Sequence, residues 1–433
     1  MDNPRKLALA SLVRADALSS YSNLEINTVI SRSELTKKNV ALYTALYMGV
    51  TEKLITLDYA IAQYSSVGLD KLDIETKNAL RLGFYQLMLM DRIPDYSAVS
   101  ETVSICPKRS KGFVNAVLRS FLRNEKRVDY PEDEWERFSI ISSTPAYIID
   151  IFRESYGDEA ARLLLSETDT QIGISLRINT LKTEVSQILS KLEGRKIEYK
   201  TESLCSDVAV VYAPVSEIED IIESGEAFVQ DIASRTAVKI FEPKAGMRIL
   251  DACACPGGKS FSSAIDMENR GEIISCDLHR SKLSLIERGA KGLGIDIIRV
   301  REQNGKEYVP ELECSFDKVL CDVPCSGLGV IRKKPDIKYK KADSVDNLPS
   351  IQRDILENCA RYVKVGGELM YSTCTLNKRE NEDVVCSFLN ANPNYEPVEF
   401  KVGDISSENG MYTFLPYVTG SDGFFVAKMR RVR

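Results

Sequence analysis

The chain has 433 residues, of which 44% are hydrophobic and 28% are charged, a composition typical of a globular protein with two or three domains. The formal net charge is −6, so the overall charge does not favour a nucleic-acid partner. Charges occur throughout the first 20 residues and no run of about 18 apolar residues is present, which argues against a signal peptide and a transmembrane helix. We therefore expect a cytoplasmic protein.

Eleven cysteines are present, and several lie inside apolar segments such as "VLCDVPC". Without a secretion signal they are expected to be reduced thiols. No C-x-x-C pair occurs and the sole histidine is His279, so we expect no zinc or other metal site. Because histidine is the usual general base, any proton transfer must rest on carboxylates, lysine or thiols.

Residues 1–130 are predicted to be all helical. Apolar residues recur at helical spacing in "NVALYTALYMGV" and "KGFVNAVLRSFL", and polar breaks such as "SVGLDKLD" separate these stretches. This pattern predicts a helical bundle. The acidic, proline-containing stretch 128–138 is predicted to be a linker.

Residues 138–225 are predicted to form a small α+β segment, and residues 228–433 show alternating strand and helix patterns. The strands of the second region are expected at 247–252, 272–277, 296–300, 317–322 and 368–372. Such alternation predicts an α/β domain with a mostly parallel sheet covered by helices on both faces. The last stretch, "YTFLPYVTGSDGFFVAKMRR", predicts two strands at an antiparallel edge.

The stretch "DACACPGGKS", residues 251–260, follows a predicted buried strand and begins a helix pattern. It resembles the end of a phosphate-binding loop, but Cys253 replaces the first glycine and Pro256 removes a backbone N–H donor. The G-x-G-x-x-G pattern of a dinucleotide site is absent. The third interpretation is a loop for S-adenosylmethionine, whose nucleoside has no pyrophosphate. Asp277 ends the next predicted strand, 277 − 251 = 26 residues after Asp251, which suits an acid that binds ribose hydroxyls.

Two further predicted strand ends carry thiols. "CDVPCSGLG" places Asp322 and Cys325 after one strand, and "YSTCTLNKREN" places Cys374 after another. In a doubly wound sheet both ends lie at the same edge as the glycine loop. A thiolate that adds to C6 of cytosine makes C5 nucleophilic toward a methylsulfonium, while an acid and a second thiol assist. The residues therefore favour methylation of cytosine C5, but their spacing leaves open which thiol is the nucleophile.

The stretches "DACACPGGKS", "DVPCSGLG" and "YSTCTLNKREN" resemble motifs of the Nop2/Sun class of RNA 5-methylcytosine methyltransferases. "RKLALASLV", "LRLGFYQLMLM" and "KGFVNAVLR" resemble the NusB-like RNA-binding domain, and "PAYIIDIFRESYGDEAARLL" resembles the segment that joins the two in bacterial enzymes. The chain is identified as a member of the RsmB/Sun family. The resemblance implies an all-α NusB-like domain followed by a Rossmann-like, S-adenosylmethionine-dependent methyltransferase domain with a mostly parallel seven-stranded sheet and an antiparallel edge.

The family implies methylation of 16S ribosomal RNA, at cytosine 967 in the usual rRNA numbering, by a monomer that acts on free RNA or an early assembly intermediate. It implies Cys374 as the nucleophile, Cys325 as the thiol that assists product release, and Asp322 beside the target base. The 138–225 segment is expected to contribute to RNA binding. The residues implied to bind S-adenosylmethionine are Cys253, Ala254, Cys255, Pro256, Gly257, Gly258, Lys259, Asp277, Asn304 and Asp322.

Three positions depart from the family pattern. Cys255 replaces a common alanine, Lys282 replaces a frequent arginine, and Asn304 replaces the aspartate that contacts the adenine side of the cofactor. Asparagine still accepts through its carbonyl, so we expect cofactor binding to survive.

The stretch "IRKKPDIKYKK", residues 331–341, is predicted to meet the RNA backbone, with an affinity that falls as salt rises. Its predicted RNA contacts are Arg332, Lys333, Lys334, Lys338, Lys340 and Lys341.

Two alternatives stay open. One keeps the same chemistry but places it on transfer RNA or on another ribosomal cytosine. The other is a non-catalytic NusB-like RNA-binding protein. The presence of both thiols, Asp322 and the glycine loop argues against the second alternative.

Overall fold

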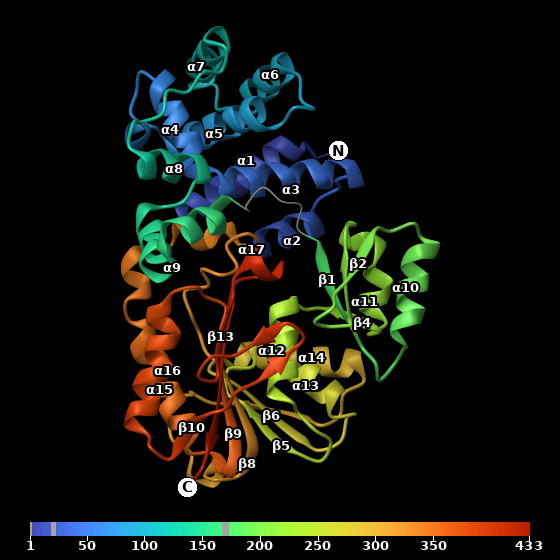
Figure 1. The fold of residues 1–433 in the computed structure, drawn as a ribbon. Coiled ribbons are helices and arrows are strands. Elements are labelled where there is room, and N and C mark those ends of the chain that lie inside the picture. Colours follow the sequence, from blue (N-terminus) through green and yellow to red (C-terminus); the bar gives the residue numbers. More distant parts are fainter. Residues whose placement is uncertain (1, 19–22, 167–172) are drawn as a thin grey trace. The chain divides into compact units, whose positions relative to one another are not determined.

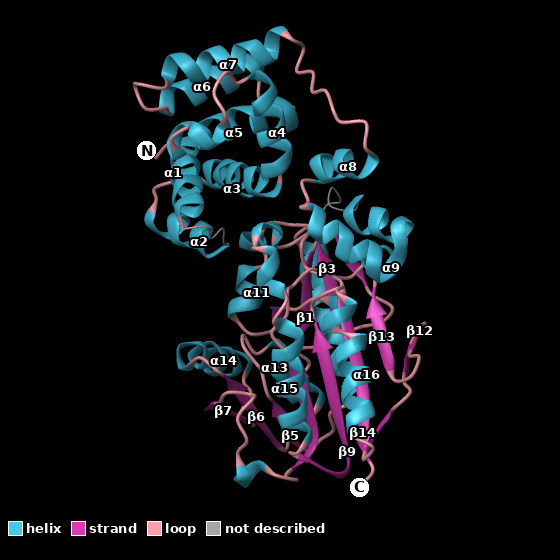
Figure 2. Cartoon of the chain, turned by 90° about the vertical axis from the view of Figure 1, so that its left-hand side faces the viewer, coloured by secondary structure: helices cyan, strands magenta, loops and turns pink. Residues whose placement is uncertain are grey.

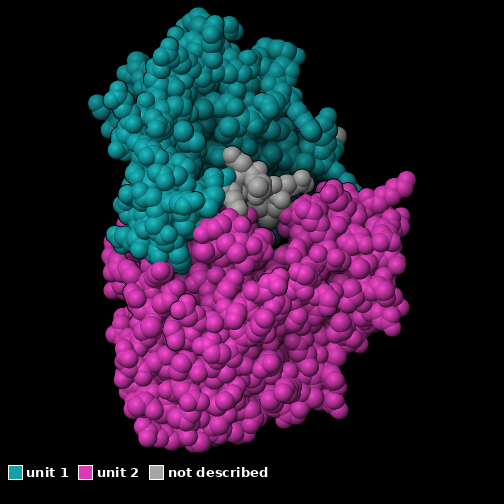
Figure 3. All heavy atoms as spheres, in the orientation of Figure 1, with its two compact units in different colours: residues 1–168, 333–340 teal, residues 169–332, 341–433 magenta. Residues whose placement is uncertain are grey.

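The computed structural model describes residues 2–18, 23–166 and 173–433. The chain forms two compact units (Figures 1 and 3). Unit 1 comprises residues 1–168 and 333–340, and unit 2 comprises residues 169–332 and 341–433. None of the described helices has the length and apolar character that a membrane crossing requires.

Unit 1 is helical, as the sequence predicts. Its described α-helices are α1 (Pro4–Ala17), α2 (Asn23–Arg32), α3 (Lys37–Glu52), α4 (Leu54–Tyr64), α5 (Ile74–Leu89), α6 (Asp95–Ile105), α7 (Lys111–Arg123), α8 (Glu134–Ser142) and α9 (Ala146–Ser166). The apolar positions of the predicted bundle are buried, among them Leu46, Leu57, Phe84 and Phe121. Burial of these side chains stabilises the unit, since each removes apolar area from water.

Helix α8 begins inside the stretch predicted to be a linker. Asp133 caps its N-terminus, because its carboxylate accepts from the backbone N–H of Glu136 at 2.8 Å. The helix packs on α4, where Thr56 Oγ1 donates to the carbonyl of Ile140 at 2.5 Å. Helices α8 and α9 therefore belong to unit 1, whereas the strands of the predicted 138–225 segment lie in unit 2.

The segment 333–340 belongs to unit 1, although its sequence neighbours on both sides belong to unit 2. Lys338 lies in its 3₁₀-helix η5 (Pro335–Tyr339) and is 1% exposed. The ammonium donates to the carbonyl of Glu52, at the C-terminus of α3, at 3.1 Å and to that of Ser142 at 3.4 Å. This burial is incompatible with the phosphate contact predicted for Lys338, because helix-end carbonyls already satisfy its charge.

Unit 2 begins with a four-stranded antiparallel sheet in the order β2-β3-β1-β4. Its strands and accompanying helices are β1 (Ile174–Ile178), α10 (Val185–Gly194), β2 (Tyr199–Thr201), β3 (Val208–Val211), α11 (Glu219–Glu223) and β4 (Ala227–Val229).

The main sheet of unit 2 has the order β10-β14-β9-β8-β5-β6-β7, which gives the predicted seven strands, and β13 adds an eighth by pairing with β14. Its strands are β5 (Arg248–Asp251), β6 (Glu272–Asp277), β7 (Ile298–Glu302), β8 (Phe316–Asp322), β9 (Val363–Thr373), β10 (Tyr395–Pro397), β13 (Met411–Phe414) and β14 (Phe424–Arg431). Strands β5 to β9 are parallel, whereas β10, β13 and β14 form the antiparallel edge. A two-stranded ribbon, β11 (Lys401–Val402) with β12 (Ile405–Ser406), lies outside this sheet.

Helices cover both faces of the main sheet, as predicted (Figures 1 and 2). They are α12 (Ile232–Phe241), α13 (Gly258–Asp266), α14 (Arg280–Leu293), α15 (Leu348–Ala360) and α16 (Glu382–Ala391), with the short α17 (Pro416–Thr419) between β13 and β14. Side chains alternate along each strand: Ile249 packs with α12–α14, whereas Leu250 packs with α15 and α16.

Replacing Arg81 of α5 with alanine is expected to lower the free energy of unfolding of unit 1 by about 3–5 kcal/mol. Arg81 is 6% exposed, and its Nη2 and Nε donate to the carboxylate of Asp58 at 2.6 and 2.7 Å. Its Nη1 also donates to Asp16 Oδ2 at 3.3 Å, so the variant leaves two carboxylates without their shared guanidinium.

The sole tryptophan, Trp135, lies in α8, so its fluorescence during urea unfolding reports on unit 1. Arg127→Ala is the matched control, because Arg127 pairs with Asp129 at the surface, where pairs contribute less than about 1 kcal/mol. If both variants lose the same free energy of unfolding, the ion pairs of Arg81 with Asp58 and Asp16 do not have the stabilising role assigned to them.

Candidate active site

Two thiols meet at the carboxyl ends of β8 and β9. These strands are parallel neighbours whose register pairs Asp322 with Ser372. Cys325 follows β8 by three residues and Cys374 follows β9 by one, and their Sγ atoms lie 3.3 Å apart. At this distance one thiol donates a hydrogen bond to the sulfur of the other.

A lysine and an aspartate complete the cluster. Lys259 Nζ donates to Asp322 Oδ2 at 2.7 Å, and Ser372 Oγ donates to Asp322 Oδ1 at 2.7 Å. Burial disfavours the Lys259 ammonium, but the charges of Asp322 and Cys374 outweigh this effect and raise the pKa of Lys259. Lys259 is therefore a cation that pairs with Asp322 and interacts electrostatically with Cys374.

Short contacts fix the two thiol loops to each other. Ser326 and Thr375, the residues after each cysteine, are joined by their hydroxyls at 2.7 Å. The backbone N–H of Gly329 donates to the carbonyl of Cys374 at 3.0 Å. A Cβ at Gly329 would lie 2.0 Å from the carbonyl oxygen of Gly423, so only glycine permits this close approach.

Cys325 is the thiol that holds its proton. The hydrogen bond to Cys374, burial, and the negative charges of Cys374 and Glu380 raise the pKa of Cys325 well above its ordinary value. The Lys259 ammonium, by contrast, favours negative charge on the sulfur of Cys374. Of the two thiols, the arrangement therefore favours the proton on Cys325.

The glycine loop lies at the carboxyl end of β5. The backbone N–H of Ala254 donates to the carbonyl of Cys276 in β6 at 2.8 Å, which ties the loop to the neighbouring strand. Gly257 has φ +113°, and a Cβ there would lie 2.3 Å from the ring of Phe261. The turn into α13 therefore requires glycine, because the Phe261 ring occupies the space that a side chain would need.

Asp251, the last residue of β5, is 2% exposed and lies under this loop. Its Oδ2 accepts from Ser260 Oγ at 2.7 Å, whereas its Oδ1 is buried without a hydrogen-bond partner. Burial, the largest cause, raises the pKa of Asp251 to about 7. An unsatisfied buried oxygen at this point fits a ligand that brings its own donor.

Asp277, the last residue of β6, and Asn304, two residues after β7, lie along the same edge. Asp277 Oδ1 accepts from the backbone N–H of His279 at 2.9 Å, and Lys282 Nζ lies 4.0 Å from it. Asn304 Oδ1 accepts from the backbone N–H of Lys306 at 3.2 Å. Both side chains are thus held in turns at strand ends, outside the hydrogen bonds of the thiol cluster.

The basic segment divides between exposed and packed side chains. Lys334, Lys340 and Lys341 are exposed, whereas Arg332 and Lys333 are half-buried. Arg332 Nη2 donates to the carbonyl of Ser421 at 3.1 Å. Together with the buried Lys338, this leaves three lysines openly placed for a polyanion.

Sequence reasoning missed two buried acids of the site. It used Asp251 only as the end of a strand, and it gave no role to Glu380, which is 0% exposed and accepts from the backbone N–H of Ser326 at 2.9 Å. Glu380 stands in the charged stretch "NKREN", a pattern typical of the surface. The apolar residues directly before Asp251 indicate a buried strand, so they could have predicted that its carboxylate is buried as well.

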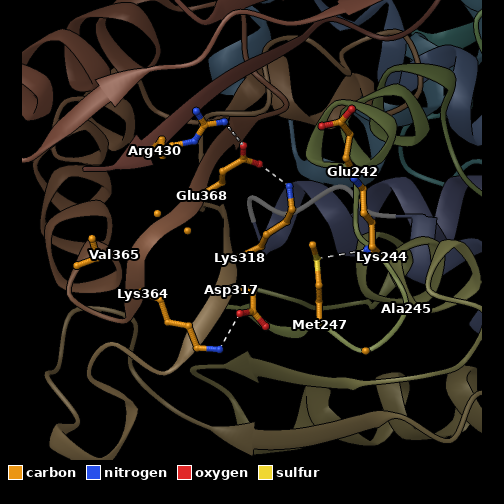
Figure 4. Close-up of a pocket in the computed structure, with 13 residues that line it drawn as sticks. Glu242, Lys244, Ala245, Met247, Asp317, Lys318, Lys364, Val365, Glu368 and Arg430 are labelled. Carbon is orange, nitrogen blue, oxygen red and sulfur yellow. Dashed lines mark hydrogen bonds and ion pairs between the residues drawn. The ribbon is translucent and has the colours of Figure 1, made fainter. Parts of the chain in front are cut away.

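A cavity of about 950 Å³ lies at the opposite, amino end of the sheet, between the start of β8 and the start of β9 (Figure 4). Its charged side chains pair with one another: Lys364 Nζ donates to Asp317 at 2.6 Å, and both Lys318 and Arg430 bind Glu368. This cavity is separate from the thiol cluster, which lies past the other ends of the same strands.

Comparison with known proteins shows which family the chain belongs to. Residues 238–430 match the family described as 16S rRNA methyltransferase RsmB/F, residues 2–123 match the NusB family, and residues 144–216 match the ferredoxin-like domain of RsmF/B-like methyltransferases. A protein of Bacillus subtilis (strain 168), named "Probable ribosomal RNA small subunit methyltransferase B", is 35% identical over 99% of this chain and 98% of its own length. The chain belongs to the RsmB/F family of rRNA methyltransferases.

Other relatives support the same family. The ribosomal RNA small subunit methyltransferase B of Shewanella oneidensis is 29% identical over 98% of each chain. The crystal structure of PH0851 has a TM-score of 0.84 and 25% identity over 100% of this chain and 99% of its own. The crystal structure of NSun6 from Pyrococcus horikoshii with SFG has a TM-score of 0.60 over 68% of this chain and all of its own, and at 20% identity it shows a shared fold.

Membership in the RsmB/F family makes the chain an S-adenosylmethionine-dependent rRNA methyltransferase. The edge formed by β5, β6 and β7 fits the cofactor of such an enzyme: it carries a buried unpartnered oxygen on Asp251, the glycine turn at Gly257 and a strand-end carboxylate at Asp277. Over the described residues, no group of three or more His, Cys, Asp or Glu side chains is arranged to hold a metal ion.

The Asp251 carboxyl predicts a specific pH dependence of stability. Because its folded-state pKa of about 7 lies above the ordinary value of 3.8, its stabilising contribution is present below pH 3.8 and is lost as pH rises through 7. Between pH 5 and pH 8 the ligand-free protein is expected to lose about 3 kcal/mol of unfolding free energy from this group.

Asp251→Asn, which has the same shape and does not titrate, is expected to lose markedly less over the same range. Urea unfolding of both proteins, followed by circular dichroism at the two pH values, measures the difference. The same pH dependence in both proteins would show that Asp251 is not the group responsible.

Proposed function

We propose that the chain methylates C5 of a cytosine in 16S ribosomal RNA, cytosine 967 in the usual numbering, through a covalent adduct between Cys374 and C6 of the base. The observation that carries this proposal is the pair of sulfur atoms 3.3 Å apart, beside the ion pair of Lys259 and Asp322. Methylation of C5 through such an adduct needs a nucleophile, a group that holds the base and a proton acceptor, and Cys374, Asp322 and Cys325 would supply them.

The cofactor edge would hold S-adenosylmethionine. We assign its contacts to the loop from Cys253 to Lys259, to Asp277 for the ribose, to Asn304 for the adenine side and to Asp322 near the methyl group. When bound, S-adenosylmethionine supplies the methyl group that C5 accepts.

The first step uses Cys374. Its thiolate adds to C6 of the cytosine, the S–C6 bond forms, and the electron pair of the C5–C6 double bond becomes available at C5. Lys259 stabilises the thiolate before the attack. Asp322, held by Lys259 and Ser372, is placed to accept a hydrogen bond from the amine of the base, as carboxylates do with cytosine. The base must leave its stack to reach these groups.

The release step uses Cys325. Once Cys374 is a thioether, it no longer offers a negative sulfur, and the leading cause of the high pKa of Cys325 disappears. Cys325 then loses its proton to solvent and its thiolate takes the proton from C5. The electron pair of the C5–H bond restores the C5–C6 double bond, and the S–C6 pair returns to Cys374 as thiolate.

The two thiols are expected to fail differently when replaced. Cys374→Ala should lower methylation by at least about a thousandfold, because no adduct forms. Cys325→Ala should form the adduct and retain it, because release lacks its base. Bisulfite sequencing of unmodified 16S rRNA after incubation with S-adenosylmethionine maps 5-methylcytosine, and denaturing gels show covalent protein–RNA species.

Three outcomes are informative. An adduct with Cys374→Ala instead of Cys325→Ala would exchange the two roles. Wild-type protein that leaves 16S rRNA unmodified but modifies transfer RNA or another ribosomal cytosine would keep the chemistry and move the substrate. RNA binding without any methylation would favour a non-catalytic NusB-like protein.

We further propose that Lys334, Lys340 and Lys341 contact the phosphate backbone, with Arg332 and Lys333 close to it. We also propose that the protein acts as a monomer, in the cytoplasm, on free 16S rRNA or on an early assembly intermediate. Phosphate contacts release counterions, so they give a steep dependence of affinity on salt.

Replacing the three exposed lysines together with alanine is expected to weaken binding to 16S rRNA by about ten- to a hundredfold at low salt and to lower the slope of log affinity against log salt by about 2 to 3. Filter binding at several salt concentrations measures both. Lys401→Ala, an exposed lysine of β11, is the control. An unchanged slope in the triple variant would remove this segment from the RNA interface.

A further inference from the structure

Glu380 is a buried carboxylate that the reaction steps above do not use. It ends the short 3₁₀-helix η7 (Lys378–Glu380) and is 0% exposed. Its Oε2 accepts from the backbone N–H of Ser326 and from Gln352 Nε2, each at 2.9 Å, and its Oε1 accepts from Asn377 Nδ2 at 3.1 Å. Burying a carboxylate among neutral donors costs free energy, which points to a purpose beyond packing.

The partners of Glu380 enclose Cys325 on both sides along the chain. Ser326 follows Cys325, and Gln352 of α15, besides binding Glu380, donates to the carbonyl of Pro324 at 3.0 Å. Glu380 itself lies on the segment that follows Cys374. One carboxylate thus connects the backbone around one thiol with the loop of the other.

The position of Glu380 is itself fixed from the sheet. The hydroxyl of Tyr371 in β9 donates to the backbone carbonyl of Glu380 at 2.5 Å. Asn381, the next residue, binds the chain on both sides of Cys374: its Oδ1 accepts from Thr373 Oγ1, at the end of β9, at 2.6 Å, and its Nδ2 donates to the carbonyl of Thr375 at 3.0 Å. Glu380 is therefore anchored to β9 and in turn holds the loop that carries Cys325.

We infer that Glu380 is a positioning residue that holds Cys325 against the base bound to Cys374, and that it governs release of the methylated RNA rather than formation of the adduct. The inference rests on the proposed function. A misplaced proton acceptor slows only the step in which it takes the proton, whereas attack by Cys374 depends on Lys259 and Asp322.

Glu380 also acts on Cys325 through its charge. The titratable groups that face Cys325 are Cys374, Glu380 and Tyr371 of β9. After Cys374, the negative charge of Glu380 is a further cause that raises the pKa of Cys325. Removing this charge lowers that pKa, so the Cys325 thiolate needed for release forms at lower pH.

The test compares Glu380→Gln with Glu382→Gln. Glu382 is a half-buried neighbour whose Oε1 accepts from Thr413 Oγ1 at 3.3 Å, away from the thiol loops. In single-turnover reactions on 16S rRNA, Glu380→Gln is expected to form the gel-stable adduct within about twofold of the wild-type rate and to resolve it about tenfold more slowly. In a plot of the release rate against pH, the rise on the acidic side should move to lower pH by about 0.5 to 1 unit, because the pKa of Cys325 falls. Glu382→Gln should match wild type in both.

A second variant distinguishes the effect of the position of Cys325 from the effect of the Glu380 charge. It also tests the inference if Glu380→Gln does not fold. Gln352→Ala removes the amide that joins Pro324 to Glu380 but keeps the carboxylate. It should slow release about threefold without moving the rise on the acidic side of the plot. Circular dichroism and thermal unfolding confirm that each variant is folded.

The inference is overturned if Glu380→Gln, or Gln352→Ala where the former does not fold, releases product at the wild-type rate. It is also overturned if adduct formation and release slow equally. Failure of the proposed function looks different: wild type then gives no 5-methylcytosine and Cys325→Ala gives no adduct, whatever happens at Glu380.

Discussion

The parallel pairing of β8 with β9 is the constraint on which the site depends. Backbone hydrogen bonds set Asp322 level with Ser372, so the chain leaves both strands at the same edge, and thiols three residues and one residue beyond them come within 3.3 Å. Their separation therefore depends on strand register, and a one-residue slip between β8 and β9 would shift the two strand ends, and the loops that carry the thiols, relative to each other. The hydroxyl pair of Ser326 and Thr375 then keeps the two loops together.

The electrostatic surroundings of the two thiols differ, and this difference gives them different roles in the proposed reaction. Lys259 stabilises negative charge at Cys374, whereas burial, Cys374 and Glu380 keep the proton on Cys325. In the proposed mechanism, adduct formation removes the influence of Cys374 on the pKa of Cys325, so the second thiol becomes a usable base only after the first has reacted. Such an order suits an enzyme whose sole histidine, His279, lies at the start of α14 and not in the thiol cluster.

Much of the fold and part of the site could be predicted from the sequence, because local patterns and strand order carry them. The helical bundle and the covered parallel sheet follow from apolar periodicity. The meeting of Cys325 and Cys374 follows from strand ends at one edge. Contacts between residues distant in sequence could not be predicted: a basic stretch suggests a polyanion, yet Lys338 satisfies its charge on the carbonyls of Glu52 and Ser142. Similarly, nothing in "NKREN" shows that Glu380 would be buried by donors from α15 and the Cys325 loop.

The most direct test of the central claim uses 16S rRNA that carries 5-fluorocytosine at the target position. Fluorine replaces the C5 hydrogen, so Cys325 has no proton to remove and the covalent intermediate persists. After digestion, mass spectrometry locates the nucleotide on the protein. The account predicts that it is attached to the peptide containing Cys374 and carries the transferred methyl group. Attachment to Cys325, or a methylated product with no trapped protein, would contradict it.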